Sequence, residues 1–341
     1  MKLRLLLLLT GILFAGATLF AWLLAGPATR FEEPRNYLFI RTGAATQEEV
    51  MQTLRDSSFI RNTGLFAFLA NRLQVWPRLR PGKYVIEKGT SLLQLARKLR
   101  NQQQEPVNLV VVKLRTNRQF AGLVGRRFEC DSLRFLTFIS NPDSTRNRGV
   151  DSTTLLSIVL PDTYTYYWSA TPAELLEKLA AYHQKFWNAQ RKQRADSLGL
   201  SPLQITVLAS IVEEETLRDD EKPLIASVYL NRLRRGMPLG ADPTVKYATG
   251  DFTLRRILFK HIQETAASPY NTYRNKGLPP GPICTPTAVT IDAVLNAARS
   301  NYLFFCARPN GNGYHAFAET DTEHLRNARA YQQWLNAQQI R

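Results

Sequence analysis

The chain has 341 residues, of which 44% are hydrophobic and 10% aromatic, and its formal net charge is +16. This length allows two modest domains or one elaborate domain, and the apolar content excludes a chain that is disordered throughout. The basic balance indicates an acidic partner, such as nucleic acid, anionic lipid or an acidic polymer, and charge alone does not choose among them.

The first segment is predicted to be a membrane anchor. Residues 5–26 carry no charge, which meets the roughly 20 residues that a span of the bilayer core requires. Basic residues precede the span and predict a short cytoplasmic tail (1–4), with the remainder outside the cytoplasm. A cleaved signal peptide is the alternative, but the run is long for a signal core and Pro27 lies at the potential cut. A polar linker over 27–35 follows the anchor.

Residues 36–105 are predicted to form a small α+β module. The stretch "TQEE" at 46–49 has the pattern of a capping box at the start of a helix. After a Pro-Gly turn, "KYVI" predicts a strand. "GTSLLQLARKLR" then predicts an amphipathic helix, because its apolar residues recur at i, i+3, i+4 and i+7.

The second region begins with "VNLVVVKL" at 107–114, which predicts a strand. The stretch 115–150 is mixed and arginine-rich, and no function is predicted for it. "LPDTYTYYW" at 160–168 is typical of a turn that enters a packed strand, and its aromatic residues leave open a place in a groove wall.

Two helices are predicted in the middle of the chain. Ser201 as N-cap and Pro202 at the first helical position begin "SPLQITVLASIVEEET". Asp219 or Asp220 is expected to cap the second helix, which ends at Gly236.

The remaining elements are a loop, a hairpin and a helix. "SPYNTYRNKGLPPGPI" at 268–283 contains four prolines, which exclude a helix and predict a rigid loop. "YLFFCA" and "YHAFAE" flank the turn-rich "RPNGNG" and predict a hairpin. The helix predicted at 321–338 is expected to be structural.

The glutamate triplet that ends the first of the two central helices is the main candidate for chemistry. Glu215 falls on the apolar face of that helix, at i+7 from Leu208, whereas Glu213 and Glu214 project to either flank. A frayed, fully solvated helix end is the alternative. A desolvated carboxyl beside like charges keeps its proton at neutral pH, as a general acid for glycosidic bond cleavage must.

Candidate substrate-binding residues lie on the proline-rich loop. Tyr270, Asn271 and Tyr273 are expected to be displayed there, where tyrosine faces and amide donors suit sugar rings. A loop that tyrosines anchor for structural reasons is an equal alternative. Asp242, in "ADPTV", either caps a turn or reaches into the site.

The cysteines and histidines predict no metal site. Cys130, Cys284 and Cys306 lack CxxC spacing, and Cys284 and Cys306 either pair outside the cytosol or are buried thiols. The four histidines show no ligand spacing either. Neither a metal nor another cofactor is therefore expected.

Several segments, taken in order, resemble the endolytic murein transglycosylase family (YceG-like proteins). They are "ASIVEEET", "SVYLNRL", "ADPTVKYA", "SPYNTY", "GLPPGPI" and "YHAF", behind an N-terminal anchor. The resemblance spans most of residues 155–320, and the module at 36–105 is more loosely similar to that family's LysM-like subdomain. It implies an α+β fold with a single N-terminal transmembrane helix, a LysM-like subdomain and a mixed α+β catalytic domain (106–341).

The resemblance also implies a function. Such enzymes cut the β-1,4 bond between N-acetylmuramic acid and N-acetylglucosamine in peptidoglycan without water, leaving 1,6-anhydro ends. The family's catalytic glutamate maps onto Glu215, with Glu213 and Asp242 in supporting roles and Tyr270, Asn271 and Tyr273 binding substrate. Glu214 departs from the family pattern, in which that position is often basic.

The expected partners are peptidoglycan glycan strands, the membrane through the N-terminal helix, and cell-wall synthases (penicillin-binding proteins). The catalytic part is expected on the periplasmic side of the bacterial inner membrane. One alternative is a hydrolase in which Asp242 or Glu213 activates water, and another is a non-enzymatic peptidoglycan-binding module. A nucleic-acid partner is not expected, because the anchor places the chain outside the cytoplasm and no reading motif appears.

Overall fold

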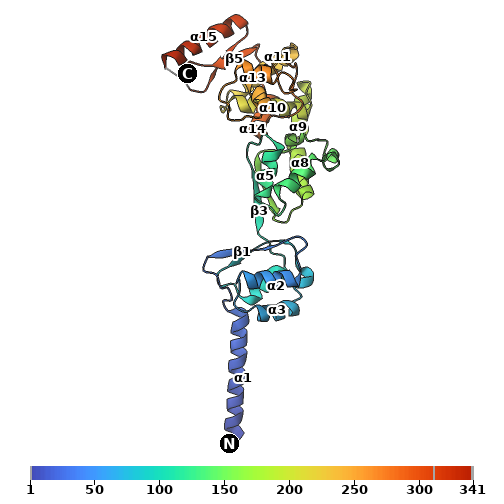
Figure 1. Cartoon of the computed structure of the whole chain (residues 1–341), viewed down its shortest axis with the longest axis vertical. Helices are drawn as coiled ribbons and strands as arrows, with labels where there is room; N and C mark the ends of the chain where they lie inside the picture. The colour runs from blue at the N-terminus through green and yellow to red at the C-terminus, as the bar shows by residue number, and fades with distance from the viewer. Residues whose placement is uncertain (1, 310–311, 339–341) are drawn as a thin grey trace. The chain divides into compact units, whose positions relative to one another are not determined.

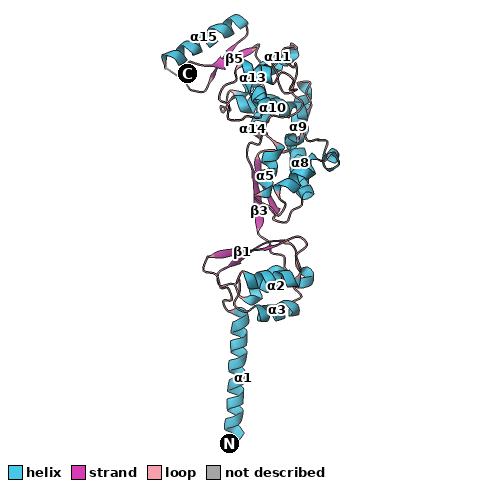
Figure 2. Ribbon diagram, viewed as in Figure 1, coloured by secondary structure: helices cyan, strands magenta, loops and turns pink. Residues whose placement is uncertain are grey.

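A computed structural model describes residues 2–309 and 312–338 of the chain (Figure 1). The chain divides into two compact units. The N-terminal unit contains Met1–Asn108, Arg127–Cys130 and Thr165–Thr171, and the C-terminal unit contains Leu109–Arg126, Asp131–Tyr164 and Pro172–Arg341. Helices predominate over short two-stranded ribbons, so the mixed α+β prediction is confirmed (Figure 2).

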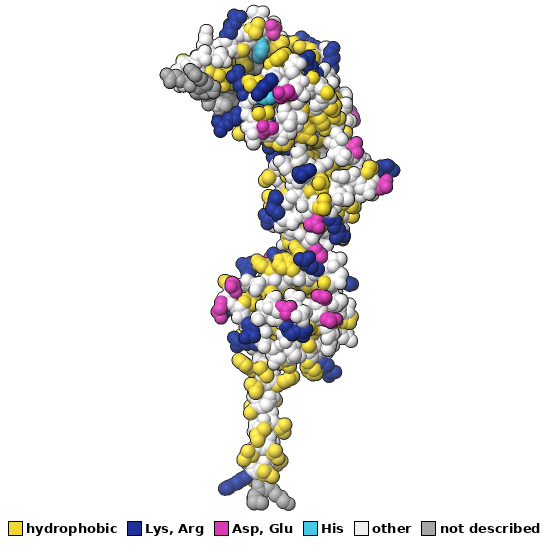
Figure 3. Space-filling model, viewed as in Figure 1, with side chains coloured by type: hydrophobic (Ala, Val, Ile, Leu, Met, Phe, Trp, Pro, Cys, Tyr) yellow, Lys and Arg dark blue, Asp and Glu magenta, His cyan; other side chains and the backbone are white. Residues whose placement is uncertain are grey.

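The chain begins with the long apolar helix α1 (Lys2–Ala25). Its stretch Leu3–Ala25 has a mean hydropathy of 2.2, and its most apolar window has no buried residue. Apolar side chains cover its surface in Figure 3. Among the described residues it is the one single helix that is long and apolar enough to cross a bilayer. The prediction of one N-terminal apolar helix is therefore confirmed.

The rest of the N-terminal unit packs around an antiparallel ribbon. Its elements are β1 (Arg35–Ile40), α2 (Gln47–Asp56), α3 (Thr63–Arg72), η1 (Trp76–Arg78), β2 (Gly82–Glu87) and α4 (Leu92–Arg100). Thr46 caps α2 through its side chain, as the sequence predicted, and Ser91 caps α4 in the same way. Alternate residues of the ribbon, such as Leu38 and Ile86, are buried against the helices. The likeness of this unit to LysM modules stays a prediction.

The region that the sequence left unassigned contains short helices. The strands β3 (Pro106–Val111) and β4 (Asp162–Tyr167) form a ribbon, and the division between the units falls near it. The intervening and following helices are α5 (Asn117–Gly125), α6 (Ser132–Ser140), α7 (Pro142–Thr145), η2 (Arg146–Arg148), η3 (Leu155–Ile158), α8 (Pro172–Phe186) and α9 (Ala189–Ser197).

The core of the C-terminal unit surrounds α10 (Pro202–Glu215). Ser201 caps this helix in a capping box and Pro202 opens it, as predicted. The elements that follow are α11 (Lys222–Arg234), α12 (Asp242–Thr249), α13 (Phe259–Glu264), α14 (Ala288–Leu295), β5 (Phe304–Ala307), β6 (His315–Ala318) and α15 (Asp321–Ala337). The β5–β6 hairpin and the irregular loop at 268–283 are confirmed.

One expectation for this unit is wrong, and one open alternative is resolved. The N-cap of α11 is Glu221, so the expectation that Asp219 or Asp220 caps it is wrong. Asp219 lies before the helix and pairs with Lys222, at the first helical position, at 2.7 Å. No disulfide joins Cys284 and Cys306, and both are thiols.

Candidate active site

The glutamate triplet lies at the end of a helix that is enclosed on several sides. Every residue of α10 from Ile205 to Glu213 is buried, and the helix contacts α9, α11, α12, α14 and η3. The expectation that Glu213 and Glu214 point away from the interior is wrong. Helical spacing identifies an inward face only when one side of a helix is covered, and here neighbours cover the flanks as well.

Glu213 is held by the N-terminus of α14. Its Oε2 accepts hydrogen bonds from the Thr287 amide at 3.3 Å, from the Thr287 hydroxyl at 3.0 Å, and from the Thr290 hydroxyl. The Lys222 ammonium lies 3.5 Å from the same oxygen. A carboxylate in this place is stabilised by the free amides of the helix start, so Glu213 ties the end of α10 to α14.

Glu214 is ion-paired to the segment before α5. Its Oε2 lies 2.8 Å from the Arg115 guanidinium, and its Oε1 lies 3.4 Å from the Lys113 ammonium. Burial raises the pKa of Glu214, but the bond and charge of Arg115 and the charge of Lys113 outweigh it, so the pKa is lowered overall. Glu214 therefore stays ionised, and part of the unassigned region serves to neutralise it.

Glu215 has a raised pKa. Burial raises its pKa from 4.5 to about 7, although the Tyr229 hydroxyl lowers it by donating to Oε1. The charges of Asp242 and Glu214 raise it further. A substantial fraction of Glu215 is therefore protonated at neutral pH, as the sequence predicted for this position.

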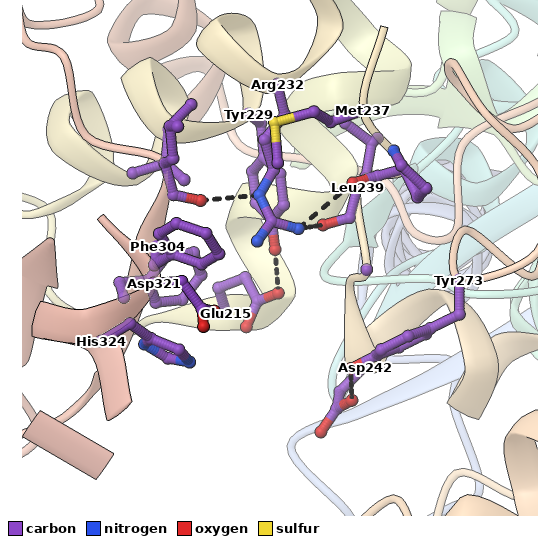
Figure 4. A pocket seen from close by; sticks show the side chains of 15 residues that line it. Glu215, Tyr229, Arg232, Met237, Leu239, Asp242, Tyr273, Phe304, Asp321 and His324 are labelled. Carbon is purple, nitrogen blue, oxygen red and sulfur yellow. Dashed lines mark hydrogen bonds between the residues drawn. The ribbon is translucent and has the colours of Figure 1, made fainter. Parts of the chain in front are cut away.

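Glu215 opens into a cavity of about 570 Å³. Figure 4 shows the side chains that line it, with Asp242 and Tyr273 on one side of Glu215 and Asp321 and His324 on the other. The labelled lining residues are Glu215, Tyr229, Arg232, Met237, Leu239, Asp242, Tyr273, Phe304, Asp321 and His324. Carboxyl groups, an arginine and aromatic rings thus share one cavity.

Asp242 and Tyr273 form a pair at one side of the cavity. The Tyr273 hydroxyl donates to Asp242 Oδ1 at 2.6 Å. Ala241 is the N-cap of α12, so Asp242 reaches the cavity from the first helical position and does not cap the helix. Burial raises the pKa of Asp242, and the bond from Tyr273 offsets part of that rise.

The other two loop residues lie elsewhere. Asn271 is fully buried, so the expectation that it is displayed is wrong. Its amide nitrogen donates to the Ile262 carbonyl at 2.9 Å and to the Thr265 hydroxyl at 3.0 Å, and its Oδ1 accepts from the Tyr273 amide at 3.0 Å. Tyr270 packs on Tyr247, with ring centroids 4.6 Å apart, and does not line the cavity. Of the three loop residues, Tyr273 alone reaches it.

Several lining residues were missed from the sequence. Tyr229 and Arg232 lie three residues apart on α11, and neither was a candidate from the sequence. Asp321 and His324 lie in the first turn of α15 and line the cavity, so this helix, which was expected to be structural, borders the candidate site. The i, i+3 spacing of polar groups on these two helices was the available signal, but it does not identify their neighbours.

Among residues 2–309 and 312–338, no group of three or more histidine, cysteine, aspartate or glutamate side chains could hold a metal ion. The polar groups that line the cavity are carboxyl, hydroxyl, imidazole and guanidinium groups.

Comparison with known proteins identifies the family. A family model described as the YceG-like family matches residues 38–330. The chain belongs to the YceG-like family. The motifs of this YceG-like chain meet at the cavity, since "ASIVEEET" supplies Glu215, "SVYLNRL" supplies Tyr229 and Arg232, and "ADPTV" and "SPYNTY" supply Asp242 and Tyr273.

Two relatives of this YceG-like chain carry the same name. The endolytic murein transglycosylase of Bacillus subtilis is 34% identical over 171 residues, which are 49% of this chain and 45% of that protein. The endolytic murein transglycosylase of Streptococcus pneumoniae is 28% identical over 309 residues, 82% of this chain and 55% of that protein. The chain spans about half the length of these curated relatives.

A solved structure shares the YceG-like fold. A yceG-like protein of Listeria monocytogenes superposes with a TM-score of 0.57 at 24% identity, covering 86% of this chain and 99% of that one. At this identity the likeness concerns the fold alone.

Proposed function

We propose that this chain is an endolytic murein transglycosylase. It cleaves the β-1,4 bond between N-acetylmuramic acid and N-acetylglucosamine in nascent glycan strands, without water, and leaves 1,6-anhydro ends that terminate strand elongation. The names of the relatives support this proposal. The observation that carries it is the Glu215 carboxyl, with a pKa of about 7, in a cavity that also holds hydroxyl and aromatic groups.

Glu215 acts first as an acid and then as a base. Its proton passes to the glycosidic oxygen while the bond from that oxygen to C1 breaks toward an oxocarbenium-like state. The C6 hydroxyl oxygen of the same sugar then bonds to C1, and its proton passes to Glu215. An ordinary glycosidase needs a second carboxylate for this half of the reaction. Here an intramolecular hydroxyl replaces it, with the advantage of proximity.

Tyr229 holds the acid in place for this chemistry. Its hydroxyl donates to Oε1 of Glu215. The transferable proton then belongs on Oε2, since a carboxyl oxygen that accepts this bond is the weaker site for it. Tyr229 is buried, which fixes the direction of its hydroxyl.

The supporting residues position the helix that carries Glu215, contact the sugar, or hold the loop that carries Tyr273. Glu213 positions the last turn of α10 through α14. Tyr273, with 38% of its surface exposed, offers a ring face to a sugar, and Asp242 orients its hydroxyl. Asn271 braces the loop that carries Tyr273, and Tyr270 anchors the same loop on Tyr247.

The proposed setting is the bacterial cell envelope. Helix α1 anchors the chain in the inner membrane by a single pass, with residues 1–4 as a cytoplasmic tail and the remainder on the periplasmic side. The basic net charge of +16 suits an acidic cell-wall polymer. We further propose a LysM-like subdomain at 36–105, a catalytic domain at 106–341, and cell-wall synthases as protein partners.

A hydrolase is the second candidate, because Asp242 lines the same cavity as Glu215. In that mechanism Asp242 would activate water, and the product would have an ordinary reducing end. The two candidates therefore differ by one water molecule in the product.

The test compares products from the full chain in detergent, incubated with purified glycan strands and analysed by mass spectrometry. Anhydro-ended products that disappear in Glu215→Gln and persist in Asp242→Asn support the transglycosylase. Hydrated ends that disappear in Asp242→Asn would establish the hydrolase instead. Glu264→Gln, an exposed position on α13, is the matched control and should behave as the wild type. No cleavage by the wild type would leave only a binding function.

A further inference from the structure

One side of the cavity is built as a layered stack. The Arg232 guanidinium lies over the Phe304 ring at 5.2 Å, and the His324 ring is stacked on Phe304 at 5.2 Å with 19° between the planes. Arg232 is fixed in turn, because it donates to the Leu303 and Leu239 carbonyls, each at 2.7 Å. The His324 ring therefore rests on a support that does not depend on any ligand.

The two nitrogens of the His324 ring differ, and Nε2 is the one that can donate to a ligand in the cavity. Among the described residues nothing hydrogen-bonds its Nδ1, and that atom is buried. Burial lowers the pKa of His324, with Asp321 raising it and Arg232 lowering it, so the ring is neutral at pH 7. A neutral ring keeps its single proton where an acceptor can reach it, and Nδ1 has none. Nε2 is then the N–H donor.

Asp321 accompanies this donor one turn earlier on α15. It is exposed and lines the same cavity, three residues before His324. Residues at i and i+3 are neighbours on a helix surface, so an acceptor and a donor stand side by side. Figure 4 shows both on the side of Glu215 away from Asp242 and Tyr273.

We propose that Phe304, Asp321 and His324, here called the α15 wall, form a binding subsite for an N-acetylhexosamine unit of the glycan. His324 Nε2–H donates to a hydroxyl or acetamido oxygen of the sugar. Asp321 accepts from a sugar hydroxyl or amide N–H. The subsite rests on the proposed function and assigns the sugar on one side of the cleaved bond to α15, with Tyr273 facing the sugar on the other side.

The test measures binding without turnover. Full-length Glu215→Gln protein in detergent is titrated with peptide-free glycan strands of alternating N-acetylglucosamine and N-acetylmuramic acid. His324→Phe keeps a ring on Phe304 but removes the donor, so it should raise Kd about tenfold, the value of one hydrogen bond of about 1.4 kcal/mol. His324→Gln restores an N–H donor and should recover part of the affinity.

Asp321→Ala tests the wall independently, because the side chain is exposed and the variant should fold. It should also weaken binding several-fold, whereas Arg329→Ala, exposed on the same helix, should not. Unchanged Kd in both His324→Phe and Asp321→Ala overturns the proposal. The proposal is also overturned if His324→Ala weakens binding while His324→Phe binds normally, because that result would mean that the ring contributes packing alone.

These failures are distinct from failure of the proposed function. If the α15 wall is not a subsite, the wild type still yields anhydro-ended products. If the chain is not a transglycosylase, those products are missing whatever the variants at Asp321 and His324 do to binding.

Discussion

The raised pKa of Glu215 predicts a stability cost that grows with pH. A carboxyl whose pKa is raised on folding stabilises the protein below its unfolded pKa and loses that contribution as pH rises through its folded pKa. For Glu215 the window runs from 4.5 to about 7. Glu215→Gln keeps the shape and the acceptor for Tyr229 but cannot ionise. The variant should therefore not lose free energy of unfolding as the pH rises.

The magnitude follows from the two pKa values. Their difference is equivalent to about 3 kcal/mol, since one pKa unit is about 1.4 kcal/mol. Glu215 is only half-buried in an open cavity, so solvent reduces this to about 1–2 kcal/mol. In a domain of this size that free energy corresponds to about 3–6 °C in Tm. Glu215→Gln should therefore melt several degrees above the wild type at pH 8 and close to it at pH 4.5.

The assay is thermal unfolding of the full chain in detergent, at steps from pH 4.5 to pH 8. Glu214→Gln is the matched control with the opposite sign, because pairing with Arg115 and Lys113 lowers the pKa of Glu214. That variant should melt below the wild type at neutral pH, and the gap should shrink below pH 4.5. A Tm difference for Glu215→Gln that stays constant across the range would refute a desolvated Glu215.

Three further changes have defined outcomes. Tyr229→Phe removes the bond that lowers the pKa of Glu215, so the alkaline limb of the kcat/KM profile should move to higher pH, and an unmoved limb contradicts the role. Glu213→Ala removes the acceptor of the Thr287 and Thr290 hydroxyls and leaves the buried Lys222 ammonium with Asp219 alone, so it should lower the free energy of unfolding by about 3 kcal/mol in urea titrations; a loss below 1 kcal/mol would count against the anchor. Asn271→Ala should lower the free energy of unfolding by about 2 kcal/mol, and it should raise KM more than it lowers kcat because Tyr273 loses a hydrogen bond that positions it. An unchanged KM would show that Asn271 does not position Tyr273 for substrate binding.

Local signals in the sequence were sufficient for the elements. Ser201 and Pro202 define the start of α10 because capping depends on neighbours within one turn. The β5–β6 hairpin follows from two apolar segments, "YLFFCA" and "YHAFAE", that flank a turn-rich stretch. Helical spacing also placed Glu215 toward the interior, and the cavity contains it.

Contacts between distant segments could not be predicted in this way. Arg115 neutralises Glu214 across a separation of 99 residues, and no periodicity within α10 reports that. Asn271 has the composition of a displayed binding residue, yet it satisfies its amide within the loop. The loop needed a buried brace, and composition does not distinguish a brace from a ligand.

The cavity draws on residues from Glu215 through His324, and this order has a consequence for biosynthesis. Chains are made from the N-terminus, so the acid emerges long before the helix that completes its surroundings. Until α11 and α12 pack against α10, the Glu215 carboxyl stands in water, where it has its ordinary acidity and no proton to give at neutral pH. A nascent chain would therefore lack a protonated Glu215 until those helices fold, and its cavity would be complete only once α15 is in place.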